Sequence, residues 1–99
     1  MDITVTHQAD EATVAVSGSL NANTATDLEA ALDGAFDGAA SVAFDFSDLD
    51  YISSAGLRVL MVAYKRATAG GGTIRVANAC EEVREVFEIT GFSDLFEIA

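Results

Sequence analysis

Segments with the period of a strand alternate along this chain with segments that have the period of a helix, and this alternation constrains the fold more than any other feature. Near the start, Ile3, Val5 and His7 alternate with polar neighbours, as in a half-exposed strand. Residues 13–17 (TVAVS) are rich in β-forming side chains and follow a short connection. The first two strands should therefore pair as an antiparallel hairpin.

The first helix is predicted over residues 24–37. Asn21, Asn23 and Thr24 are all plausible N-caps, and Thr24 with Asp27 forms a variant of the capping box. The apolar face of this helix is predicted to contain Leu28, Ala31, Leu32, Ala35 and Phe36.

Further strands and helices follow in turn. They are predicted as a strand over 42–46, a loop over 47–53, a helix from Ser54 to the glycines at 70–72, a strand over 73–77, a helix that Gly91 closes, and a strand over 95–98. Asn78 and Glu81 make a second variant capping box before the last helix. The core stripe of the middle helix is predicted at Leu57, Leu60, Met61 and Tyr64, broadened by Val59 and Val62.

The order of elements is therefore β-β-α-β-α-β-α-β. Strands joined through single helices need right-handed crossovers, so the sheet after the hairpin should be largely parallel, with the helices packed against it. The chain has 99 residues, of which 51% are hydrophobic, which suits one core and not two. We expect a single α/β domain over residues 1–99.

Composition excludes several classes of function. The net charge of −11 opposes binding to DNA or RNA, and the acidic excess lies in residues 1–50, which hold ten acidic and no basic residues. One cysteine, Cys80, and one histidine, His7, supply neither a disulfide nor a structural zinc site. No apolar stretch approaches the roughly 18 residues of a membrane span, and no signal peptide follows Met1, so we expect a cytoplasmic protein without direct membrane insertion.

The stretch FDFSDLDYISSAGLRVL at residues 44–60 carries the most chemical information. Ser53 and Ser54 lie at the predicted helix start, where backbone N–H groups and the helix dipole can stabilise a phosphate on a serine oxygen. Ala55 and Gly56 should leave the surrounding surface open to another protein. This pattern suggests a phosphoacceptor, although the local pattern alone favours a plain helix cap.

Together with GSLNANTA at 18–25, the strand TIRVAN and the ending VFEITGFSDLFEI, this stretch resembles the STAS domain of bacterial anti-sigma factor antagonists. The resemblance covers nearly the whole chain. It implies a non-enzymatic regulatory module that binds an anti-sigma factor, itself a serine kinase with a GHKL-type ATP site, and thereby frees a sigma factor. The kinase would phosphorylate a serine at this helix start, and a serine phosphatase would reset the protein.

Aligning the residues that follow the acceptor in some relatives places it on Ser54, with Ser53 as the fallback. The partner-binding residues implied by the resemblance are Asn21, Ala22, Asn23, Thr24, Asp50, Ser53, Ala55, Gly56 and Leu57. The chain departs from many relatives at Asn21 and from some at Ser53, where those relatives carry an acidic residue. In other relatives the acceptor stands where this chain has Ala55. Recognition of a different kinase, or docking without phosphorylation, therefore stays open.

Two alternatives stand beside this interpretation. One is a STAS subunit of a signalling scaffold or of a lipid or anion transport assembly. The other is a small hydrolase or transferase that uses Ser54, which lacks a histidine or lysine base nearby in sequence. Asp48 and Asp50 are better explained by turns and solubility than by catalysis, so we expect no catalytic residue, metal or cofactor.

Overall fold

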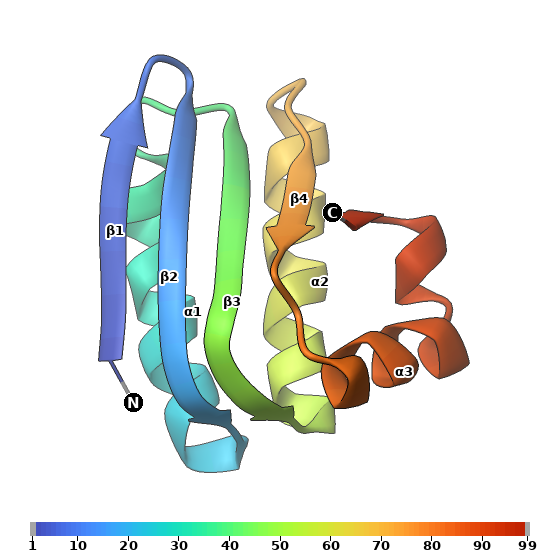
Figure 1. Ribbon diagram of the computed structural model, residues 1–99. Coiled ribbons are helices and arrows are strands. Elements are labelled where there is room, and N and C mark those ends of the chain that lie inside the picture. Colours follow the sequence, from blue (N-terminus) through green and yellow to red (C-terminus); the bar gives the residue numbers. More distant parts are fainter. Residues whose placement is uncertain (1, 99) are drawn as a thin grey trace.

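Five strands form one sheet in the computed structural model, which describes residues 2–98 (Figure 1). In spatial order they are β1 (Asp2–Gln8), β2 (Glu11–Leu20), β3 (Ser41–Ile52), β4 (Ile74–Ala77) and β5 (Glu97–Ile98). β1 and β2 pair antiparallel, and each later pair is parallel. This confirms the initial hairpin and the largely parallel sheet.

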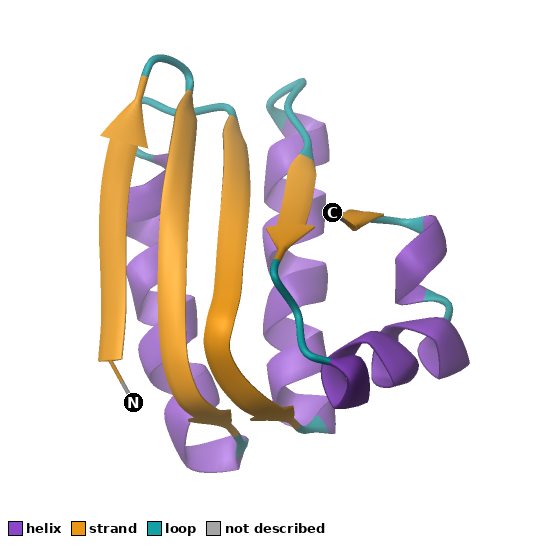
Figure 2. Cartoon of the chain, in the orientation of Figure 1, coloured by secondary structure: helices purple, strands orange, loops and turns teal. Residues whose placement is uncertain are grey.

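The helices are α1 (Ala22–Phe36), α2 (Ser54–Ala69) and α3 (Glu81–Thr90), followed by a short 3-10 helix over Phe92–Asp94. α1 and α2 lie side by side against one face of the sheet (Figures 1 and 2). α3 lies beside the second half of β3, past the end of β4 (Figure 1). The predicted order of strands and helices is therefore confirmed, as is the α/β class.

The core lies between the sheet and the two long helices. Alternate residues of neighbouring strands point into it, because side chains of a strand alternate between its two faces. Val14 of β2, Phe44 of β3 and Val76 of β4 are all fully buried, and they meet Leu28 and Leu60 in one apolar cluster. Burying an aliphatic or aromatic side chain of this kind contributes roughly 1.5–3 kcal/mol each.

The loop predicted over residues 47–53 is wrong, because β3 continues to Ile52. Two register shifts lie in its pairing with β2, and at each shift β3 has one residue more than β2. Such bulges break the strict alternation of apolar and polar residues by which a strand is recognised in a sequence. Leu49 and Ile52 are buried, whereas Asp48 and Asp50 are exposed.

Two predicted helix starts also need correction. α1 begins at Ala22, two residues before the predicted position, because Asn21 is its N-cap. The N-cap of α3 is Cys80, which makes no side-chain capping bond. Asn78, the predicted cap, has a left-handed φ of 62° and donates instead to Asp45 Oδ1 at 3.2 Å. Gly91 ends α3 with a φ of 81°, as the sequence predicts.

The buried face of α2 is rotated from the predicted stripe. Its buried residues are Gly56, Val59, Leu60, Ala63 and Ala67. Leu57, Met61 and Tyr64 are half-buried at the margin of this face. Three of the five buried positions hold glycine or alanine, and Leu57 at the margin stays partly accessible beside the start of α2.

Candidate functional site

The candidate site lies at the end of the sheet where β2 and β3 lead into α1 and α2 (Figure 1, lower end). Carboxyl ends of parallel strands and amino ends of the helices that follow them meet at one edge, where ligands and partners commonly bind α/β proteins. The amide of Ser53 donates to the Leu20 carbonyl oxygen at 2.8 Å. This bond joins the junction before α2 to the junction before α1.

The start of α1 is closed by a complete capping box. Asn21 Oδ1 accepts from the amides of Asn23 at 2.9 Å and Thr24 at 3.1 Å. In return, Thr24 Oγ1 accepts from the Asn21 amide and donates to the Ser19 carbonyl oxygen, both at 2.8 Å. Asn21 and Thr24 are thus engaged within the fold, while Ala22 and Asn23 are exposed.

The start of α2 is simpler. Ser53 is its N-cap, and its Oγ accepts from the Gly56 amide at 3.3 Å. Ser54 is the first helical residue, and it is exposed. The first turn carries no acidic side chain. Of the two serines, one caps the helix and the other presents its hydroxyl at a helix start that has no carboxylate.

The expectation that Gly56 leaves an open surface is wrong. Gly56 is buried, and a Cβ placed there would lie 2.7 Å from Leu20 Cγ and 3.0 Å from Ile52 Cγ1. Leu20 itself is fully buried, so it has little room to move. Glycine is needed here for close packing between α2 and the ends of β2 and β3. The neighbouring Ala55 and Leu57 are half-buried and so remain partly accessible beside Ser54.

Asp50 belongs to the same end of the molecule. Its Oδ1 accepts from Ser19 Oγ at 2.9 Å, which fixes an exposed carboxylate at the end of the sheet. The neighbouring Tyr51 is 54% exposed. Sequence reasoning missed Ser19 and Tyr51, because the pairing of β2 with the second half of β3 was not foreseen and nothing local in the sequence reveals it.

The predicted partner-binding residues therefore lie together on two neighbouring strand-to-helix junctions, with two qualifications. Gly56 contributes packing and no accessible side chain. The side chains of Asn21 and Thr24 serve the α1 cap.

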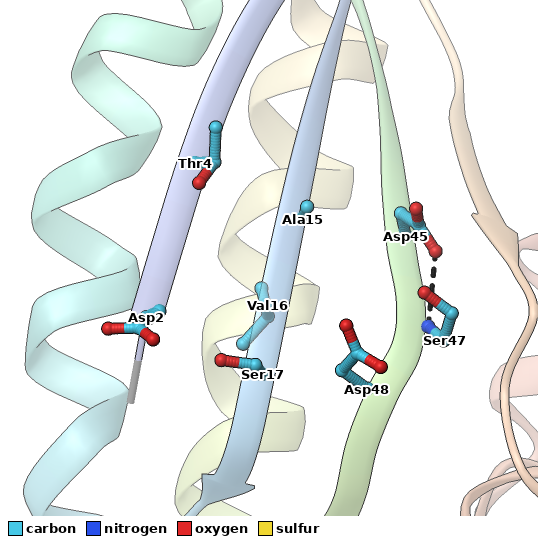
Figure 3. A pocket seen from close by; sticks show the side chains of 8 residues that line it. All are labelled: Asp2, Thr4, Ala15, Val16, Ser17, Asp45, Ser47 and Asp48. Carbon is cyan, nitrogen blue, oxygen red and sulfur yellow. Dashed lines mark hydrogen bonds between the residues drawn. The ribbon is translucent and has the colours of Figure 1, made fainter.

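A separate pocket of about 270 Å³ lies on the sheet face opposite α1 and α2 (Figure 3). Its lining residues are Asp2, Thr4, Ala15, Val16, Ser17, Asp45, Ser47 and Asp48. Asp45 Oδ1 accepts from the Ser47 amide at 3.1 Å and from Asn78 Nδ2, and these bonds hold the pKa of Asp45 below its ordinary value. The lining offers carboxylates and hydroxyls but no basic side chain.

The remaining candidates are apart from Ser54. His7 lies near the far end of α1, where its Nε2 is 3.1 Å from the Gly34 carbonyl oxygen, so it cannot serve Ser54 as a base (Figure 1). Cys80 is half-buried at the start of α3. Among residues 2–98 no three histidine, cysteine, aspartate or glutamate side chains are grouped so that they could hold a metal ion.

Comparison with known proteins matches residues 3–97 to the family model described as "Mlab, STAS domain". BtrV of Bordetella bronchiseptica, named as a candidate anti-sigma factor antagonist, is 41% identical over 85 residues, which cover 85% of this chain and 73% of BtrV. This chain belongs to the STAS family of anti-sigma factor antagonists. The anti-sigma-B factor antagonist of Bacillus subtilis is 24% identical over the whole of this STAS domain and 91% of its own length.

Solved structures show the same fold. Unphosphorylated SpoIIAA, an anti-sigma factor antagonist, superposes with a TM-score of 0.85 at 18% identity, covering 99% of this STAS domain and 88% of SpoIIAA. The phosphorylated form of Bacillus SpoIIAA gives a TM-score of 0.74 at 17% identity, covering 99% and 91%. In the described part of the chain, no helix has the length and apolar character to cross a membrane.

Proposed function

We propose that this STAS domain is an anti-sigma factor antagonist, a non-enzymatic module that binds an anti-sigma factor with serine kinase activity and is switched by phosphorylation of Ser54. The observation that carries the proposal is the exposed Ser54 at the start of α2, at the end of the sheet where Ser19 also holds the Asp50 carboxylate in place. The names of the two curated relatives support the antagonist role. The phosphorylated form of the structural relative SpoIIAA supports the switch.

The two serines differ in how available their hydroxyls are. Ser53 is half-buried, and its Oγ caps α2. A phosphoryl group on Ser53 Oγ would weaken the bond that this oxygen accepts from the Gly56 amide. Ser54 is exposed, and among residues 2–98 its side chain has no hydrogen-bond partner. A kinase active site can therefore reach Ser54 without disturbing the fold, which favours it as the acceptor.

Electrostatics explains how one phosphate could leave the fold intact and still prevent binding. At the helix start the positive end of the dipole and the unpaired amides of the first turn favour an anion. A phosphate adds about −1.5 to −2 charges. In a complex the phosphate would be desolvated against the partner surface, and a charge that is excluded from water and left unpaired is costly. Folding should survive phosphorylation while the partner is released, and a serine phosphatase would restore binding.

The docking surface proposed for the kinase consists of the exposed and half-buried residues of the two junctions. These are Ala22 and Asn23 at the start of α1, Asp50 and Tyr51 on β3, and Ser54, Ala55 and Leu57 on α2. The acidic character of the first half of the chain suits a partner with a basic surface. A GHKL-type serine kinase with such a surface is the partner that we propose, and the cytoplasm is the compartment that we expect.

The test is phosphorylation and binding with the kinase that co-purifies from native cells. With Mg²⁺ and ATP it should modify the wild-type protein on Ser54, leave Ser54→Ala unmodified, and still modify Ser53→Ala. Titration calorimetry should show weaker binding by Ser54→Asp than by Ser54→Ala. Phosphate found only on Ser53 would overturn the choice of acceptor, and equal affinity for the modified and unmodified proteins would overturn the switch.

A further inference from the structure

The amino end of α2 has an uncompensated positive character. The first turn of α3 carries Glu81 and Glu82, which complement the helix dipole, whereas the first turn of α2 carries no acidic residue. One turn further along α2 comes Arg58, which is exposed. The positive end of the α2 dipole and the Arg58 guanidinium are thus both present near Ser54 before any modification.

Arg58 also differs from the other arginines of the sheet and the long helices. Arg66 forms an ion pair with Asp33, and Arg75 forms one with Glu11, each at 2.8 Å. No ion pair involves Arg58 among the residues that the structure describes. Its guanidinium is therefore available to a new anion without the loss of an existing pair.

The helix places Ser54 and Arg58 on the same face. Residues four apart in a helix are neighbours, and helical side chains lean towards the amino end, so an arginine at position 58 can reach the turn that begins with Ser54. Guanidinium binds phosphate through two parallel N–H···O bonds, which a lysine cannot reproduce. Lys65 lies eleven residues after Ser54, about 16 Å along the helix axis, which is too far for a similar contact.

We propose that Arg58 is the intramolecular partner of a phosphate on Ser54, an inference that rests on the proposed function of this site. Phosphorylation would then change the surface twice, by adding an anion and by engaging a cation that the unmodified protein leaves exposed. Asp50, which Ser19 fixes at the same end of the sheet, opposes the added charge from β3. Arg58 offsets that repulsion within the free domain.

The experiment installs phosphoserine at position 54 of the full chain during translation, so that it needs no kinase. A ³¹P NMR titration then measures the second pKa of the phosphate in the otherwise wild-type chain and in Arg58→Gln. We expect Arg58→Gln to raise that pKa by about 0.3 unit or more, because the arginine stabilises the dianion. Lys65→Gln, which removes the same charge from the same helix, is the matched control and should leave it within about 0.1 unit.

A second readout is the melting temperature of four proteins, which combine the presence or absence of the phosphate with the presence or absence of the Arg58→Gln substitution. Arg58→Gln should lower the melting temperature of the phosphorylated protein and leave that of the unmodified protein unchanged. The pairing would be overturned if the phosphate had the same pKa in Arg58→Gln and Lys65→Gln and if Arg58→Gln changed the melting temperature equally with and without the phosphate. Because the phosphate is installed without an enzyme, failure of the kinase assay alone would leave this result standing.

Discussion

α1 and α2 begin next to each other at the same end of the sheet, but their amino ends are built differently. α1 starts with a reciprocal capping box, in which the side chains of Asn21 and Thr24 each accept a hydrogen bond from the backbone amide of the other. α2 starts with one serine cap at 3.3 Å, and the next residue is an exposed serine. The polar side chains of the first junction are used for folding, whereas the second keeps one hydroxyl free for chemistry.

The two junctions are nevertheless connected. The Ser53 amide binds the Leu20 carbonyl oxygen, and Leu20 packs where a Gly56 side chain would have to fit. The well-capped start of α1 therefore forms part of the rigid support on which Ser54 is presented. Rigid elements below an exposed functional group are typical of sites that a partner must recognise in one geometry.

Disrupting the packing of Gly56 against Leu20 and Ile52 should have the largest effect on stability. Gly56→Val would force side-chain atoms into the space of Leu20 and Ile52, and overpacking of this kind costs about 2–3 kcal/mol. We expect the melting temperature to fall by roughly 10 °C or more. Gly34→Ala is the control, since nothing lies within 4 Å of a Cβ at that helical position, and it should stabilise by about 0.5–1 kcal/mol. A Gly56→Val protein that melts like the wild type would contradict the close packing.

Removing the cap of α1 comes next. Asn21→Ala loses the acceptor for two backbone amides, so we expect a loss of about 1–2 kcal/mol in urea unfolding. Asn23→Ala changes an exposed residue of the same helix start and should stay within about 0.5 kcal/mol of the wild type. If the two alanine variants were equally stable, the capping box would not be the device that holds this junction.

The cap of α2 should matter less. Ser53→Ala removes a single long bond to the Gly56 amide, and we expect it to cost about 0.5–1 kcal/mol. The same urea unfolding measurement serves both variants. A loss as large as that of Asn21→Ala would remove the difference between the two helix starts.

Substitutions at Ser54 should have the smallest effect on stability. Ser54→Ala should leave the free energy of unfolding within about 0.5 kcal/mol of the wild type, because the hydroxyl is exposed. Ser54→Asp should stabilise by about 0.3–1 kcal/mol through the helix dipole, an effect that added salt reduces. Thermal melts at low and high salt check both. Marked destabilisation by Ser54→Ala would mean that the Ser54 hydroxyl stabilises the fold.

The sequence by itself determined the α/β class, the order of the elements and the presence of serines at the start of α2. Each of these depends on local patterns, since periods of two or 3.6 residues and turn-forming glycines act through neighbours in the chain. The resemblance to STAS domains rested on similarly contiguous stretches, such as residues 44–60. The family comparison agrees with it over residues 3–97.

Only the tertiary structure decided which of the site residues are accessible. The strand character of residues 47–52 depends on pairing with β2, and the fixed position of Asp50 depends on Ser19, 31 residues earlier. The burial of Gly56 depends on Leu20 and Ile52, which reach it from two different strands. These features arise from contacts between segments far apart in the chain, and no local pattern of residues records where such segments meet.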